Sequence, residues 1–263
     1  MKILFLGDIV GRPGRRAIRA LLPDLTRTFL PDVIVANAEN AAGGFGINQK
    51  ILDELFQMGI HVITTGNHVW DKRELIPIID REPRLIRPMN YVPEAPGKGA
   101  YRMELPTGGV LWVINLQGKI LMPPIQCPFR TLDHFLETLP PDEKCVLVDF
   151  HAEATSEKRA MGFYFDGRVS LMLGTHTHVP TADAEILEGG TGYITDVGMT
   201  GPYASVIGMD PRSSIERMLY GMPTALNVAK GKPAIAAVFA EVDEETGRCL
   251  SFESRLIKLE ESR

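Results

Sequence analysis

Five short apolar runs in this chain each end at a residue of a type that binds metal ions. Buried strands of a parallel sheet read as such runs, and in α/β folds ligands bind at the carboxyl ends of the strands. The runs end at Gly7-Asp8, Ala38-Glu39-Asn40, Gly66-Asn67-His68, Phe150-His151 and Gly174-Thr175-His176-Thr177-His178. The pattern therefore predicts an α/β fold in which several strand ends carry one shared polar site.

The spacing of apolar residues predicts the other elements as well. Strands are expected at 2–6, 32–36, 61–65, 100–105, 110–116, 145–150, 169–173, 182–187, 192–196, 233–241 and 250–259. Helices are expected at 15–29, 49–58, 71–80, 132–139 and 213–220, with a kink or break at Pro23. No repeat or clear linker interrupts the chain. We expect a single domain over 1–263, with two sheets packed face to face and helices outside.

Composition and charge limit the partners. With 263 residues, 44% hydrophobic and 23% charged, the chain can bury a sizeable core. Its formal net charge of -5 argues against a broad basic surface for long nucleic acid. A nucleotide or short oligonucleotide remains compatible, because two bound divalent ions would add four positive charges at one place.

Cysteine usage and the N-terminus indicate the compartment. Cys127, Cys145 and Cys249 are odd in number and form no C-x-x-C pair, so we expect no disulfide framework and a reducing cytoplasm. The apolar run after Met1 is too short for a signal peptide, and no stretch is long enough to span a membrane. A cytoplasmic protein without membrane contact is expected.

Each polar strand end is weak evidence alone, since an Asp there usually caps a turn and a lone His is usually structural. Four of the six histidines nevertheless follow apolar runs, whereas His61 begins a strand and His134 lies on a helix. Two ions about 3.5–4 Å apart need a bridging anion, which Glu39 can supply. If His176 and His178 lie on a strand, their side chains point to the same side; in a loop this argument weakens.

The order of these motifs resembles the metallophosphoesterase (calcineurin-like) superfamily. The resemblance implies a two-sheet β-sandwich flanked by helices, in four layers α/β/β/α. Two positions depart from the usual pattern, because Val10 stands where a histidine is usual and Glu39 where an aspartate is usual. Both departures match the YmdB-like bacterial phosphodiesterases, which the chain resembles along its whole length in GDIVG, NAENAAGG, TGNHVWD, DFHAEATSEK, GTHTHVPTAD and DVGMTGP.

The resemblance implies a ligand set for two metal ions. One ion would be bound by Asp8, Glu39, Asn40 and His178, and the other by Glu39, Asn67, His151 and His176. Asn40 would take the place of the histidine missing at Val10. His68 would be catalytic and donate a proton to the leaving oxygen; the alternative is a hydrogen-bond partner of the ligands.

The implied reaction is hydrolysis of 2′,3′-cyclic nucleotides, of the cyclic AMP type, to 3′-nucleotides by metal-hydroxide attack. The ligand types favour Fe or Mn, and they also admit Zn or Co. Relatives suggest a homo-oligomer. The alternatives are a phosphomonoesterase, an RNA nuclease with RNA as partner, or a nucleotide-sensing regulatory protein with weak turnover.

Other motifs are less specific. The glycine-rich segment 41–46 matches no phosphate-loop pattern, so it either approaches a nucleotide or serves as a flexible loop. The segment 155–158 is typical of a capped helix start. Arg12, Arg15 and Arg16 could meet phosphate, although a solvated helix face is favoured. No role follows from the sequence for the segment 199–222.

Overall fold

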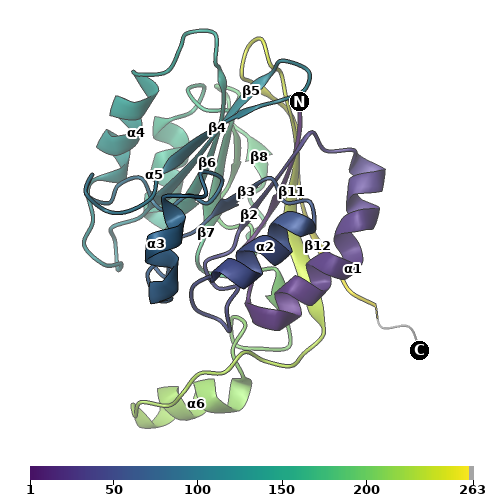
Figure 1. Ribbon diagram of the computed structural model, residues 1–263, viewed down its shortest axis with the longest axis vertical. Helices are drawn as coiled ribbons and strands as arrows, with labels where there is room; N and C mark the ends of the chain where they lie inside the picture. The colour runs from purple at the N-terminus through teal and green to yellow at the C-terminus, as the bar shows by residue number, and fades with distance from the viewer. Residues whose placement is uncertain (261–263) are drawn as a thin grey trace.

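The computed structural model describes residues 1–260 and contains two mixed sheets packed face to face (Figure 1). The first sheet has the order β10-β11-β1-β2-β3, with β12 also paired to β11. Its strands are β1 (Lys2–Leu6), β2 (Val33–Asn37), β3 (Val62–Thr64), β10 (Gly201–Pro202), β11 (Pro233–Val242) and β12 (Cys249–Lys258).

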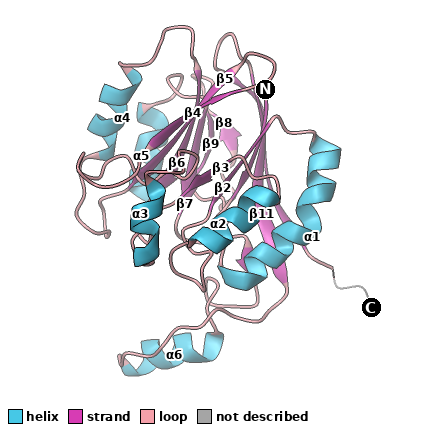
Figure 2. Ribbon diagram, in the orientation of Figure 1, coloured by secondary structure: helices cyan, strands magenta, loops and turns pink. Residues whose placement is uncertain are grey.

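The second sheet has the order β4-β5-β6-β7-β9-β8. Its strands are β4 (Ala100–Glu104), β5 (Val110–Gln117), β6 (Cys145–His151), β7 (Leu171–Thr175), β8 (Glu185–Ile186) and β9 (Gly192–Ile194). The helices are α1 (Gly11–Phe29), α2 (Gln49–Gln57), α3 (Ile76–Ile79), α4 (Pro128–Leu136), α5 (Thr155–Tyr164) and α6 (Pro211–Tyr220), with a 3₁₀ turn η1 (Arg73–Leu75) (Figure 2).

Three apolar clusters produce the four layers. Along β1 the side chains alternate, so that Leu4 and Leu6 face α1 and α2, while Ile3 and Phe5 face the second sheet. A third cluster packs α4 and α5 against the outer face of the second sheet. The expected fold class, two sheets flanked by helices, is confirmed.

Strand direction brings the polar strand ends together. β1, β2 and β3 are mutually parallel, and so are β5, β6, β7 and β9. Parallel neighbours end at the same edge of their sheet, so the residues that follow β1, β2, β3 and β7 and the last residue of β6 lie at one end of the sandwich.

Several expected bounds differ from the structure. α1 begins at Gly11 and runs through Pro23 without a break, since Ile18 and Leu22 hold it against the sheet on the N-terminal side of the proline. The helix expected at 71–80 is reduced to η1 and α3. The sequence pattern indicates only the start of a helix at Thr155; the structure extends it to Tyr164, and its N-cap is Ala154, which has no capping side chain.

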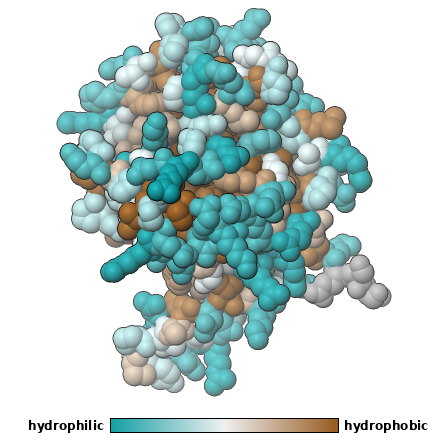
Figure 3. All heavy atoms as spheres, viewed as in Figure 1, coloured by the Kyte–Doolittle hydropathy of each residue, from teal (hydrophilic) through white to brown (hydrophobic). Residues whose placement is uncertain are grey.

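Residues 203–232 leave the body between β10 and β11 and carry α6. We call this segment the arm; α6 stands apart from the rest of the molecule at the bottom of Figure 1. Hydrophobic side chains are visible where the arm meets the body (Figure 3). Met218, Leu219 and Tyr220 on α6 are largely exposed. Within residues 1–260, no helix combines the length and the apolar character that crossing a membrane would require.

Candidate metal centre

Three histidines at the strand ends have their outer ring nitrogens bound to the protein. His178 Nδ1 lies 2.8 Å from the carbonyl oxygen of Ile207, which can only accept, so this nitrogen carries the proton. His176 Nε2 lies 3.0 Å from the Glu153 carboxylate and likewise donates. In the neutral form of each ring, the inward-facing nitrogen is then the one without a proton.

His151 is held in the same way. Its Nδ1 lies 2.9 Å from Thr175 Oγ1, and that hydroxyl donates at 2.6 Å to the buried carboxylate of Asp149. The hydroxyl must then accept from Nδ1, which leaves Nε2 facing the same centre as the other rings. Such outer partners fix the tautomer and orientation of metal-binding histidines.

Two buried carboxylates face these rings. Glu39 Oε1 lies 3.0 Å from His151 Nε2, and its other oxygen accepts the backbone N–H of His68. Burial alone would raise the pKa of Glu39, but when His151 is protonated its charge and its hydrogen bond, together with the His68 N–H, lower this pKa to about 2. Asp8 Oδ1 lies 3.8 Å from both His151 Nδ1 and His178 Nε2, and burial raises the pKa of Asp8.

The donor set fits a cation. His151 Nε2 lies 3.0 to 3.1 Å from Glu39 Oε1, Asn67 Oδ1 and His176 Nδ1, yet one N–H can donate to only one of them. Glu39, His151 and His176 each offer a ligand atom within 4.8 Å of the others. Asp8 Oδ1 is buried without a hydrogen-bond partner in the described chain. A positive ion would satisfy the ligand atoms of Glu39, His151 and His176 together, and further positive charge nearby would give Asp8 Oδ1 the partner that it lacks.

Asn40 lies on the side of Asp8 and His178. Its Nδ2 is 3.1 Å from His178 Nε2 and 3.2 Å from Glu39 Oε1. A half-turn of the amide would present Oδ1 in place of Nδ2, and the two orientations have the same shape. All seven residues expected as ligands are thus gathered at one place.

His176 and His178 converge for a reason other than strand alternation. β7 ends at Thr175, and both histidines lie in the following loop with φ of 100° and 65°. Thr177 between them donates from its N–H and its hydroxyl to Asp196, at 3.0 and 2.7 Å. Asp196 also forms a buried ion pair with Lys158 at 2.7 Å. This pair fixes the loop, and the sequence pattern suggests neither residue.

His68 lies beside the cluster rather than within it. It is half-buried, and its Nδ1 lies 2.8 Å from Asp71 Oδ2, which orients the ring. Phe45 packs edge-on against it at 5.1 Å between ring centroids. Asp71 begins the helix expected at 71–80, but its carboxylate binds His68 instead; the motif N-H-x-x-D could have suggested this contact.

The glycine before Asn67 is required by close packing. A Cβ at Gly66 would lie 2.2 Å from His151 Cδ2 and 2.4 Å from Glu39 Oε2. Any side chain there would displace the two residues at the centre of the site.

The two remaining histidines serve the fold. His61 Nδ1 accepts the backbone N–H of Ile34, and His134 Nδ1 donates to the carbonyl oxygen of Arg130. Glu157, expected near a helix cap, instead accepts the backbone N–H groups of Lys119 and Ile120. None of these three joins the cluster.

Known proteins resemble the chain over its whole length. The model of the YmdB-like protein family matches residues 4–254. The 2′,3′-cyclic-nucleotide 2′-phosphodiesterase of Bacillus subtilis (strain 168) is 45% identical over 98% of this chain and 97% of its own. A crystal structure of a hypothetical protein from Thermus thermophilus is 42% identical with a TM-score of 0.92, covering 98% of this chain and 99% of that one.

A crystal structure from Mycoplasma pneumoniae, described as a novel phosphatase, is 36% identical with a TM-score of 0.93. It matches 98% of this chain and 93% of that one. A family model that spans nearly the whole sequence, together with relatives matched over most of both chains, identifies the family. The chain belongs to the YmdB-like protein family.

Proposed function

We propose that this protein is a metal-dependent phosphodiesterase that hydrolyses 2′,3′-cyclic nucleotides to 3′-nucleotides. The observation that carries the proposal is the set of inward-facing ring nitrogens around the buried carboxylates of Asp8 and Glu39. The Bacillus subtilis relative at 45% identity supports the choice of substrate.

Two ions are proposed, of Fe or Mn, with Zn or Co as alternatives. Asp8, Glu39, Asn40 and His178 would hold one, and Glu39, Asn67, His151 and His176 the other. Such ions polarise phosphoryl oxygens and lower the pKa of bound water. The protein fixes the orientation of the three histidines through hydrogen bonds. Their partners are Thr175, Glu153 and the Ile207 carbonyl oxygen.

His68 is proposed as the acid. In the reaction a water molecule gives up one proton to solvent as its oxygen bonds to phosphorus, and the bond from phosphorus to O2′ breaks. O2′ takes a proton from His68, which then regains one from solvent. Asp71 holds Nδ1 of the ring, so Nε2 is the nitrogen that can reach the substrate. The product is the 3′-nucleotide.

The test is turnover of 2′,3′-cyclic AMP, 3′,5′-cyclic AMP and an aryl phosphodiester, each with Fe, Mn, Zn or Co. Metal content is measured alongside for the wild type and Asn67→Ala. We expect preference for the 2′,3′-cyclic substrate and loss of both metal and turnover in the variant. Retained turnover in metal-stripped Asn67→Ala would refute the mechanism.

A phosphomonoesterase is the second candidate, because the Mycoplasma pneumoniae structure is described as a phosphatase. An aryl phosphomonoester and a short RNA in the same panel separate the alternatives. Tight nucleotide binding without turnover under any of the four metals would favour a nucleotide-sensing role. The cytoplasmic location and the homo-oligomer stay predictions.

A further inference from the structure

A hollow of about 380 Å³ opens directly from the candidate metal centre. Small-molecule sites have volumes of about 300–1,000 Å³, so this hollow can hold one nucleotide-sized ligand. Its polar lining residues include Glu39, Asn40, His68, Glu153, His176 and His178. Its apolar lining residues are Phe45, Ile207, Met209 and Leu226, which we call the apolar wall.

The apolar wall is built from two segments that are far apart in sequence. Phe45 belongs to the glycine-rich loop after β2, and the other three residues belong to the arm. Loop and arm touch at Gly44, whose φ is +98°, because a Cβ there would lie 2.9 Å from Met209 Cε and 3.0 Å from Val228 Cγ2. The missing side chain of Gly44 therefore lets the two segments form one surface.

The backbone of Ile207 is strained where it contributes to this surface. Its φ is 45°, a left-handed conformation that is strained for a β-branched residue, and its side chain is half exposed. Its carbonyl oxygen is the group that binds His178 Nδ1. The same backbone position thus orients a candidate metal ligand and presents an apolar side chain beside it.

We infer that the apolar wall binds the nucleobase of the substrate, an inference that rests on the proposed function. With the phosphate at the metal centre, the rest of the substrate must lie along the remaining lining of the hollow. Phe45, Ile207, Met209 and Leu226 bring no charge and no side-chain hydrogen-bond donor, and the Met209 sulfur is only a weak acceptor. A flat aromatic base gains contact there, whereas a polyol such as glycerol would lose its hydrogen bonds to water without replacement.

The test compares two five-membered cyclic phosphodiesters, 2′,3′-cyclic AMP and glycerol 1,2-cyclic phosphate, which lacks a base. The readout is the ratio of their kcat/KM values in the metal-loaded protein, for wild type, Phe45→Ala and Leu226→Ala. Stacking of a base on an aromatic side chain corresponds to about a 5- to 150-fold effect on alanine substitution. We expect the ratio to fall by that factor in Phe45→Ala and by less in Leu226→Ala.

Met218→Ala is the matched control, because Met218 is an exposed apolar residue of the arm that lies outside the hollow. It should leave the ratio at the wild-type value. If Phe45→Ala does not fold, as judged by circular dichroism, Phe45→Leu removes the aromatic ring and keeps the apolar volume.

Binding of 3′-AMP and of inorganic phosphate, measured by calorimetry, separates this inference from the proposed function. If the wild type cleaves neither cyclic substrate, the proposed reaction fails, and 3′-AMP binding that is weakened by Phe45→Ala would still support the subsite. An unchanged substrate ratio together with unchanged 3′-AMP affinity in both wall variants would overturn the inference.

Discussion

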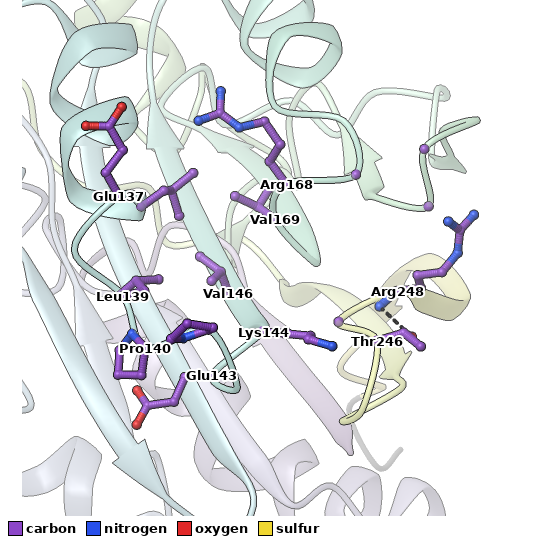
Figure 4. Close-up of a pocket in the computed structure, with 16 residues that line it drawn as sticks. Glu137, Leu139, Pro140, Glu143, Lys144, Val146, Arg168, Val169, Thr246 and Arg248 are labelled. Carbon is purple, nitrogen blue, oxygen red and sulfur yellow. Dashed lines mark hydrogen bonds between the residues drawn. The ribbon is translucent and has the colours of Figure 1, made fainter.

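Two hollows of the same volume, about 380 Å³, lie at opposite ends of the strands. One is the hollow beside the candidate metal centre, at the carboxyl ends. The other lies at the amino ends of β6 and β7 and is bordered by Lys144, Arg168, Val169 and Arg248 (Figure 4). Volume alone therefore does not identify the site of chemistry in this molecule.

The difference lies in where the charged groups of each lining are directed. At the amino ends, Glu143 pairs with Arg102 and Trp112, and Arg168 pairs with Asp133, so their charges are balanced by neighbours near solvent. At the carboxyl ends, the lining residue Glu39 is fully buried and faces His151, which in turn faces Asp8, and these two are fully buried as well. Buried carboxylates and imidazoles that face one another with more acceptor atoms than N–H donors indicate a functional site. Ion pairs at the surface do not.

The largest expected effect follows from Glu39→Gln. The substitution keeps the shape of the side chain and removes the one charge shared by both proposed ions, so turnover should fall to background and metal content should drop. Elemental analysis and turnover of 2′,3′-cyclic AMP measure the two effects. Arg248→Ala, in the opposite hollow, is the control and should change neither. Full activity in Glu39→Gln would contradict the assignment of the site.

His68→Asn should leave metal content unchanged and lower kcat by about 100- to 10,000-fold, the usual contribution of a general acid. Asp71→Asn should have a smaller effect, because it only loosens the ring. The measurement is kcat alongside elemental analysis. A loss of bound metal in His68→Asn would instead make this residue a ligand.

Lys158→Met should lower the free energy of unfolding by about 3–5 kcal/mol, because it leaves the buried Asp196 without its cation. Urea unfolding followed by circular dichroism measures the change. The double variant Lys158→Met/Asp196→Asn should be less destabilised than the sum of the single variants. Strict additivity would mean that the two residues do not interact.

The smallest expected effect concerns Cys145, which is buried at the start of β6, beside the hollow at the amino ends of the strands. Burial raises the pKa of the Cys145 thiol to about 11, so at pH 8 this thiol is protonated and unreactive. Iodoacetamide should modify the half-buried Cys127 first, and Cys145 only after unfolding. Mass spectrometry of digests gives the sites. Equal rates at Cys127 and Cys145 would show that the amino ends open readily.

The sequence was sufficient to predict the fold class and to nominate the strand ends. The fold class follows from the spacing of apolar residues, which is a local property of the sequence. The strand ends follow from a general rule, that parallel strands end at the same edge of a sheet. Seven residues expected as ligands come from such positions, and the structure brings all seven to one place.

The sequence was not sufficient where geometry depends on distant parts of the chain. The left-handed backbone of His176 and His178 is held by Asp196 and Lys158, so no local propensity reveals it. The arm reaches the site through its contact with the glycine-rich loop and through the Ile207 carbonyl oxygen that binds His178, and neither contact is visible in the local sequence. Pro23 would break an isolated helix, but packing against the sheet keeps α1 continuous.

The residues of the candidate centre come from both sheets. Asp8, Glu39, Asn40 and Asn67 follow strands of the first sheet. In the second sheet, His151 ends β6, and His176 and His178 follow β7. A cation bound by both groups would cross-link the two halves of the sandwich, so unfolding would have to release it. Because a ligand that binds only the native state stabilises that state by mass action, the melting temperature should rise with free ion concentration. Ions bound at this centre would then also stabilise the folded sandwich.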